Sequence, residues 1–525
     1  MKRVADILLQ GVERFGPRLA LADPFESVTY AQLGVQASRL GRSLRGLGAL
    51  PGERSLVVLP NSVNFVRAHF ANLLAGLVSV PCDSNITADT LGSIAGSCRP
   101  RCLLTDQASL SRLTAQAPLP DCIKDVLLLD HAPLKTGGTA GVWISAELCA
   151  NQPSDLLDTP RGENEIASLM YTTGTTGRPK GVQLTHANIL AALRSIVEFV
   201  GYTSDDREVV ILPLSHNFGL GHVYCNLITG GAVYTENGLA RVGRVLKAVE
   251  SFGATGFPGT PMGFGMLIDQ YAPVFAQKAR NLRFSVVDSA PLPPERTKQI
   301  RELLPGLDIM VYYGLTEASR TAFISLSRCG PDYYRSVGRP MKHVEVQIRA
   351  PQGTALPSGE TGEVVIRGAA VTPGYWNNPE ENKTVFSDGW LHTGDLGHTD
   401  ADGFLWITGR IKDVINTGGY KVNPSEVEKV LLTLPGVREA GVVGIEGLGK
   451  LTGESVVAAL VTEPGFVLDE PEVQRHCIAR LEKHKVPVRF VLVAEINRTN
   501  TGKIKRAELA RLVAAAMAES SVPAA

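Results

Sequence analysis

Short apolar runs that alternate with helical patterns restrict the fold of this chain more than any other feature. Leucines and an alanine recur at helical spacing between Leu33 and Leu47, and a second helical pattern covers 64–75. The apolar runs have the length of buried strands and lie at 55–59, 78–80, 102–104, 126–129, 166–170, 209–213, 232–234 and 285–287. This alternation predicts layered α/β subdomains with parallel strands over about the first 320 residues.

The pattern of predicted strands and helices changes after about residue 330. Short strands with alternating polarity, separated by Gly/Pro turns, are expected at 344–348, 362–367 and 404–407, and they predict a small antiparallel or barrel-like unit. A compact α+β pattern then runs to the end, with helices at 424–434 and 470–483 and strands at 439–443, 456–461 and 490–493. A chain of 525 residues is too long for one core. We predict an α/β protein with a large N-terminal domain, 1–408, and a small mobile α+β C-terminal domain, 414–525.

Composition restricts the partners and the compartment. Lys plus Arg and Asp plus Glu both number 52, so no bulk charge attracts nucleic acid or an anionic membrane, and small-molecule partners are expected. The eight cysteines lack the spacing of a disulfide framework or a zinc site, which favours a reducing compartment. The longest apolar run, 70–82, is too short for a membrane span. The sequence therefore predicts a soluble cytoplasmic protein, as a monomer or homodimer.

A stretch rich in glycine and threonine, 171–181, is predicted to bind phosphate, and we call it the Gly/Thr loop. Its three glycines let backbone N–H groups face an anion, four threonine hydroxyls add donors, and Lys180 adds positive charge. The stretch is not a Walker A loop, because Lys180 is followed by Gly181. The helical pattern at 186–200 is expected to add a helix N-terminus nearby. The candidate phosphate-binding residues are Thr172, Thr173, Gly174, Thr175, Thr176, Gly177 and Lys180.

Four further motifs follow the Gly/Thr loop in a fixed order. They are Tyr312-Tyr313-Gly314-Leu315-Thr316-Glu317, Leu391-His392-Thr393-Gly394-Asp395, Gly409-Arg410-Ile411-Lys412-Asp413 and Thr501-Gly502-Lys503-Ile504. Together with the Gly/Thr loop, this set resembles the signature of the AMP-forming adenylating superfamily. That superfamily contains acyl-CoA synthetases, aryl-acid ligases, carrier-protein-loading adenylation domains and firefly-type luciferases. The resemblance covers nearly the whole chain.

The resemblance implies roles for these residues toward ATP and Mg²⁺. Tyr313 would stack on adenine, Thr316 would donate to the α-phosphate, and Glu317 would hold Mg²⁺. Asp395 would accept hydrogen bonds from the ribose, and Arg410 would donate to ribose or phosphate. Lys503 would bridge the attacking carboxylate and the α-phosphate, where negative charges must meet. The remaining implied positions are Tyr312 and Gly314 beside the nucleotide and Lys412 as the hinge residue within 409–413.

Two further stretches resemble family elements, one beside the acid pocket and one beside the adenine. Pro213 to Gly219 contains His216, Asn217 and Phe218, and His216 would orient the carboxylate or control entry to the pocket. Val287 to Leu292 resembles the adenine strand, which supplies Ser289, Ala290 and Pro291 to the nucleotide. Asp288 stands where a glycine is usual. A carboxylate there would shorten the pocket or require a donor, because an unpaired buried charge is costly, so we predict compact or hydrogen-bonding acids.

The thiol site and the late lysine show two further departures from the family pattern. Gly418 and Gly419 match a turn that lets the pantetheine of coenzyme A pass close to the backbone. Asn416 stands where many relatives carry lysine. Asn497 replaces a proline that usually lies a few residues before the late lysine, which affects loop stiffness more than chemistry.

The motifs together predict an acid–thiol ligase that uses ATP, Mg²⁺ and coenzyme A. A carboxylate attacks the α-phosphate to give an acyl-adenylate and pyrophosphate, and the thiol then displaces AMP. The alternatives are an adenylation enzyme that loads a carrier protein, a luciferase-like oxygenase and a non-catalytic acid sensor. The sensor is disfavoured by the complete set of Lys180, Glu317, Asp395, Arg410 and Lys503. The sequence does not specify the acid.

Overall fold

The computed structural model describes residues 1–130, 141–173, 179–288, 292–417, 420–446, 454–466, 469–498 and 502–520. The chain divides into two compact units. Among the described residues, the first unit contains those within 1–288, 292–345 and 366–391, and the second contains those within 346–365 and 392–520. The mixed α/β architecture confirms the predicted fold class. The second unit includes residues that precede residue 409 in the chain, within 346–365 and 392–408. The predicted domain limits stay a prediction.

A seven-stranded sheet forms one layer of the first unit. All its neighbouring strands are parallel except β8 and β9, which form an antiparallel hairpin. Apolar side chains on its outer face pack under the helices α4 (Ala88–Cys98) and α5 (Gln107–Gln116). In spatial order the strands are β7 (Val142–Ile144), β6 (Asp125–Leu128), β5 (Cys102–Thr105), β3 (Arg54–Val58), β4 (Val78–Cys82), β8 (Ile166–Thr173) and β9 (Pro179–Thr185).

A second layer of the first unit consists of two four-stranded sheets. Single bridges from Gly256 to Glu208 and to Phe284 connect the two sheets. The first sheet has the order β10 (Arg207–Val210), β11 (Ala232–Thr235), β1 (Leu19–Ala22), β2 (Ser27–Thr29). The other has the order β12 (Phe284–Val287), β13 (Asp308–Tyr313), β14 (Ala322–Ser325), β15 (Arg339–Pro340).

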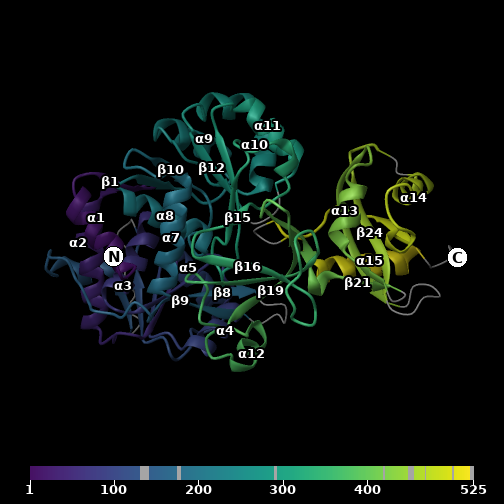
Figure 1. Ribbon diagram of the computed structural model, residues 1–525. Helices are drawn as coiled ribbons and strands as arrows, with labels where there is room; N and C mark the ends of the chain where they lie inside the picture. Colours follow the sequence, from purple (N-terminus) through teal and green to yellow (C-terminus); the bar gives the residue numbers. More distant parts are fainter. Residues whose placement is uncertain are drawn as a thin grey trace. The chain divides into compact units, whose positions relative to one another are not determined.

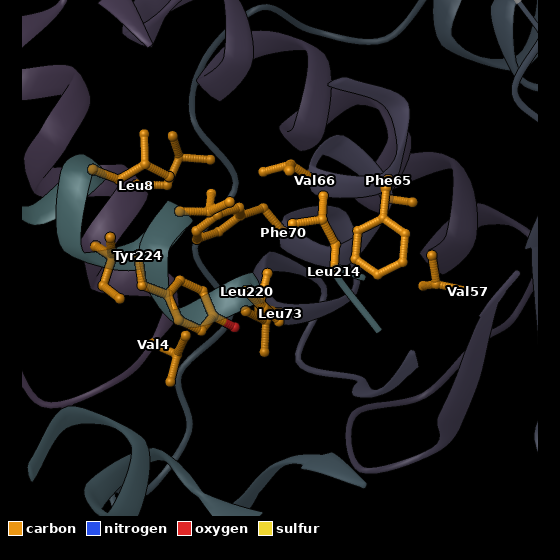
Figure 2. Packing of buried hydrophobic residues seen from close by; sticks show 14 of the residues in the cluster. Val4, Leu8, Val57, Phe65, Val66, Phe70, Leu73, Leu214, Leu220 and Tyr224 are labelled. Carbon is orange, nitrogen blue, oxygen red and sulfur yellow. The ribbon is translucent and has the colours of Figure 1, made fainter. Parts of the chain in front are cut away.

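Five helices fill the space between these layers and make the main core. Helices α3 and α7 pack on the seven-stranded sheet, α8 packs on β10 and β11, and α1 packs on α8. Figure 1 shows α7 and α8 between β10 and β8. Figure 2 shows Phe65, Phe70 and Tyr224 among the aliphatic side chains of this core. The five helices are α1 (Ala5–Phe15), α2 (Tyr30–Gly46), α3 (Val63–Leu74), α7 (His186–Val200) and α8 (Asn217–Thr229).

The remaining helices of the first unit complete its surface. Phe257, Phe264 and Phe275 pack their rings together, and two of these residues lie on α10. The helices are α6 (Ser145–Ala150), α9 (Val242–Ser251), α10 (Pro261–Lys278), α11 (Pro294–Leu303) and α12 (Pro379–Val385). Strands β16 (Val344–Arg349), β17 (Gly362–Gly368) and β19 (Trp390–Thr399) each begin in one unit and end in the other, and β18 (Phe386–Ser387) belongs to the first.

The second unit has a three-stranded sheet with a core on each face. Helices α13 and α14 cover one face, and α15 covers the other. The sheet order is β23 (Val437–Glu446), β24 (Glu454–Thr462), β25 (Arg489–Leu492). The other elements are β20 (Leu405–Arg410), β21 (Ile415–Thr417), β22 (Tyr420–Val422), α13 (Pro424–Leu431), α14 (Glu470–Ile478) and α15 (Arg506–Ser520).

One local expectation about the Gly/Thr loop is wrong. The loop does not lead directly into a helix, because 179–185 forms strand β9 and pairs back along β8. Thr173 pairs with Pro179 at the loop end of this hairpin, whereas Ile166 pairs with Thr185 at the other end, where α7 begins. Seven residues of strand span roughly 20 Å. The α7 N-terminus is therefore too far from the loop to add its partial charge there.

Candidate adenylate-forming site

Lys180 lies on β9, opposite Thr172 on β8, where the hairpin approaches the Gly/Thr loop. Its ammonium group forms an ion pair with Glu381 Oε1 on α12 at 2.5 Å. The same ammonium lies 5.6 Å from the centroid of the Tyr375 ring. Lys180 is thus held between a carboxylate and an aromatic face. The loop residues Gly174, Thr175, Thr176 and Gly177 lie outside the described residues.

Glu317 follows β13 in a tight turn that begins at Gly314. A side chain at Gly314 would collide with the backbone of Arg320, at 2.5 Å from its nitrogen, so only glycine fits. Glu317 Oε1 accepts a hydrogen bond of 2.7 Å from the Tyr375 hydroxyl. Tyr375 therefore contacts both the predicted metal-binding carboxylate and the predicted phosphate-binding lysine. Sequence reasoning missed Tyr375, because no pattern connects residues 58 positions apart.

Tyr312 and Tyr313 end strand β13 and, as neighbours on a strand, face opposite sides of the sheet. The Tyr312 ring lies in the core, packed edge-on against Phe218 at 5.4 Å. Its hydroxyl donates to the Asp288 carboxylate. Burial, and after it the Asp288 charge, raise the pKa of Tyr312 well above its ordinary value. Asp288 is half-buried and has a donor within the protein. Ser289, Ala290 and Pro291 lie outside the part of the chain that the structure describes.

The three consecutive residues that are predicted to contact the acid, 216–218, lie at the N-terminus of α8. His216 is the N-cap residue, and desolvation by the surrounding protein lowers the pKa of its ring. Asn217 Nδ2 donates to the Thr316 carbonyl at 3.4 Å. Phe218 is buried against Tyr312. The structure thus brings the α8 N-terminus together with the turn that carries Thr316 and Glu317.

Arg320 is a second site residue that sequence reasoning missed. It is 4% exposed and has a φ of +59°, which is uncommon for a side chain other than glycine. Its guanidinium donates to the carbonyls of Asn217 at 3.0 Å and Phe218 at 3.2 Å. It also lies over the Tyr312 ring, 5.3 Å from the centroid. Within the described ranges it forms no salt bridge with a carboxylate, so a positive charge is buried beside the predicted acid pocket.

In the second unit, Asp395 and Arg410 face each other across strands β19 and β20. Arg410 Nε donates to Asp395 Oδ1 at 2.5 Å, and Asp395 is buried. Desolvation, Arg410 and Lys503 lower the pKa of Lys412, whereas Asp413 and Asp395 raise it, and the net shift is downward. The predicted hinge lysine thus lies within electrostatic reach of the predicted late catalytic lysine.

Lys503 is exposed, and both of its neighbours in the chain contact Arg498. Arg498 forms a bridge with Ile504, and its Nη1 donates to the Gly502 carbonyl at 3.0 Å. Arg498 therefore holds the residues on either side of Lys503. Asn416, in the β21–β22 hairpin, donates its backbone N–H to Glu454 at 3.0 Å. Gly418 and Gly419 lie outside the described residues.

Comparison with known proteins identifies the class that this fold and site define. The model for "AMP-binding enzyme" matches residues 8–376, and the model for "AMP-binding enzyme C-terminal domain" matches residues 426–503. The chain therefore belongs to the AMP-binding enzyme family, and the predicted relationship to the AMP-forming adenylating superfamily is confirmed.

Relatives and solved structures match almost the whole chain. It is 31% identical over 509 residues to an oxalate–CoA ligase of Arabidopsis thaliana, covering 95% of this chain and 96% of that protein. It is 32% identical over 493 residues to a feruloyl-CoA synthase of an Amycolatopsis species, covering 92% and 94%. The structure of the anthranilate CoA ligase AuaEII with anthranoyl-AMP has a TM-score of 0.86 at 27% identity, covering 99% of this chain and 98% of that chain.

Among the described residues, no helix is long and apolar enough to cross a membrane.

Proposed function

We propose that this protein is an AMP-forming acid–CoA ligase. The observation that carries the proposal is the position of Tyr375, which donates to Glu317 while its ring lies beneath the Lys180 ammonium. A carboxylate and a cation held by one side chain suit a magnesium–triphosphate group, which needs both. The family and the CoA-ligase names of the relatives support the same activity.

Glu317 fits the expected Mg²⁺. One carboxylate oxygen accepts from Tyr375, which leaves the other oxygen for a ligand. No group of three or more acidic, His or Cys side chains in the described ranges forms a separate cation cage. This suits Mg²⁺, which proteins usually bind through one or two carboxylates together with substrate phosphates. When bound, the ion would neutralise charge on the leaving pyrophosphate.

In the first half-reaction, a carboxylate oxygen of the acid bonds to the α-phosphorus of ATP, and the bond to pyrophosphate breaks. Lys180 would leave Glu381 to bind the phosphates, and Lys503 would bring the acid and the α-phosphate together. Asp395 would accept from the ribose hydroxyls, with Arg410 fixing its orientation. His216 and Asn217 would position the acid next to Thr316.

In the second half-reaction, the sulfur of CoA bonds to the acyl carbon, the thiol proton is lost, and the bond to AMP breaks. AMP is a good leaving group, so no dedicated strong base is required. The turn predicted from the sequence at Gly418 and Gly419 would admit the pantetheine. We place the enzyme in the cytoplasm, because its free cysteines favour a reducing compartment.

A panel of aryl, amino-aryl, short and long acids tests the proposal. Pyrophosphate release should require MgATP and an acid, and mass spectrometry should find an acyl-CoA only when CoA is added. A thioester that forms on a phosphopantetheinylated carrier protein but never on CoA would contradict the CoA acceptor. The absence of pyrophosphate with every acid would contradict adenylation.

A further inference from the structure

Behind Phe218, four polar side chains form a buried cluster that the mechanism above does not use. The Glu208 carboxylate is fully buried and accepts from the Asn226 amide at 2.7 Å and from the Tyr202 hydroxyl at 3.2 Å. His222 Nδ1 lies 2.8 Å from Glu208 Oε1 and 2.9 Å from the Tyr202 oxygen. A carboxylate only accepts hydrogen bonds, so Nδ1 carries a hydrogen.

The other ring nitrogen of His222 has no hydrogen-bond partner within the described ranges. His222 is only 2% exposed, so bulk water does not form a hydrogen bond with this nitrogen. Buried polar atoms are almost always hydrogen-bonded, and an exception requires an explanation such as a ligand. In contrast, both ring nitrogens of the buried His69 are paired, with Ser79 and Tyr224.

The position of His222 connects this nitrogen to the predicted acid pocket. His222 follows Phe218 by one helical turn, and the two rings lie 5.3 Å apart. Phe218 in turn packs on Tyr312, whose hydroxyl contacts Asp288. The neighbouring Gly221 has no side chain, which leaves room for the Arg320 guanidinium against α8. One face of α8 thus carries Phe218, the Arg320 contact and His222 in succession.

On the basis of the proposed function, we propose that His222 Nε2 binds a hydroxyl group at the far end of an aromatic acid substrate. The rings of Phe218 and Tyr312 offer aromatic contacts to the body of such an acid. A hydroxyl serves Nε2 in both protonation states, because it donates to the neutral ring and accepts from the protonated one. Glu208, Tyr202 and Asn226 fix the ring so that Nε2 remains directed away from their cluster.

The test compares hydroxyaryl acids with their deoxy and methoxy analogues. The wild-type enzyme should release pyrophosphate with the hydroxy acid at a kcat/KM at least tenfold above that of either analogue, because a site built for a hydroxyl is left unpaired by an acid without one. His222→Leu should remove this preference by lowering kcat/KM for the hydroxy acid, with the deoxy acid little affected. His222→Gln, which keeps a polar side chain, should restore part of the preference.

Two results would overturn the inference. One is equal use of hydroxy, methoxy and deoxy acids by the wild-type enzyme, a comparison that needs no variant to fold. The other is an unchanged preference in His222→Leu. Calorimetric binding of the same acids without ATP separates this inference from the proposed function. A hydroxyl preference in binding without pyrophosphate from any acid would support the subsite and contradict the ligase.

Discussion

In the first unit, Lys180 and Glu317 are held by Glu381 and Tyr375, which lie 201 and 58 positions away along the chain. In the second unit, Asp395 is held by Arg410, only 15 positions away in the same hairpin. The first arrangement exists only when the whole unit has folded. The second needs only its own hairpin. The phosphate-site contacts therefore depend on the packing of the whole first unit, whereas the Asp395–Arg410 contact is local.

The largest effect is expected for Lys503→Ala, which tests the second unit. Adenylation should slow on the order of 10²–10³-fold, as for the loss of one preorganised transition-state donor. Thioester formation from supplied acyl-AMP should survive, because the lysine acts where the acid meets the α-phosphate. Pyrophosphate release and acyl-CoA formation measure the two steps separately. Lys505→Ala, at a neighbouring lysine that pairs with Glu508, is the matched control. An equal slowing of both steps would refute the role of Lys503.

Lys412→Pro should separate the two half-reactions. Lys503 and the predicted thiol-site residues Gly418 and Gly419 all follow Lys412 in the chain, and both sites are assigned to the same acyl group in successive steps. The segment after Lys412 is therefore expected to rotate, with the change in backbone angles concentrated near Lys412. Proline fixes φ near −65° and removes that freedom. Pyrophosphate release should persist, whereas thioester formation should fall by about tenfold or more. Lys412→Ala should be mild in both steps, and equal losses in Lys412→Pro would place the hinge elsewhere.

Tyr375→Phe tests the first unit, and its expected effect on activity is smaller. The variant keeps the ring beside Lys180 but loses the hydroxyl that donates to Glu317. The KM for MgATP should rise about fivefold, which is the equivalent of one ordinary hydrogen bond. Titration of Mg²⁺ at fixed ATP should show a weaker response in the variant. Tyr420→Phe, at an exposed tyrosine, is the control. Unchanged KM and Mg²⁺ dependence would show that Tyr375 does not position Glu317.

Asp288→Gly should have the smallest effect on rate and a visible effect on selectivity. The substitution removes the carboxylate that accepts from Tyr312 and provides space in the predicted pocket. We expect the range of accepted acids to widen, with changes of a few-fold in kcat/KM across the acid panel. A wild-type enzyme that prefers long saturated fatty acids over every aryl or short acid would contradict this prediction.

Local patterns predicted much of the fold. The apolar runs at 55–59, 78–80 and 102–104 fall on β3, β4 and β5, and the helix expected at 186–200 is α7 with the same limits. Thr185 explains the start of α7, because its hydroxyl accepts from the Asn188 N–H. The sequence does not predict strand β9, because its first residues continue a glycine- and proline-rich stretch that is typical of a loop.

The sequence predicts the residues of the site better than the contacts between them. The motifs identify Glu317 and Lys180, but their partners Tyr375 and Glu381 belong to no motif that was recognised. The sequence shows that Asp288 departs from the family pattern, yet its donor, Tyr312, is brought to it by the pairing of β12 with β13. Such partners are determined by tertiary packing, which a single sequence does not encode at fixed spacing.

The ion pair between Lys180 and Glu381 has a consequence for selectivity among anions. The lysine is 12% exposed, and the Glu381 carboxylate neutralises its charge. A single phosphate or sulfate would have to replace a carboxylate already at contact distance, and it would gain little by the exchange. A triphosphate that also reaches the Gly/Thr loop and Glu317 offers several contacts in return for one. Free inorganic phosphate should therefore compete poorly with ATP, and the enzyme should tolerate millimolar phosphate without marked inhibition.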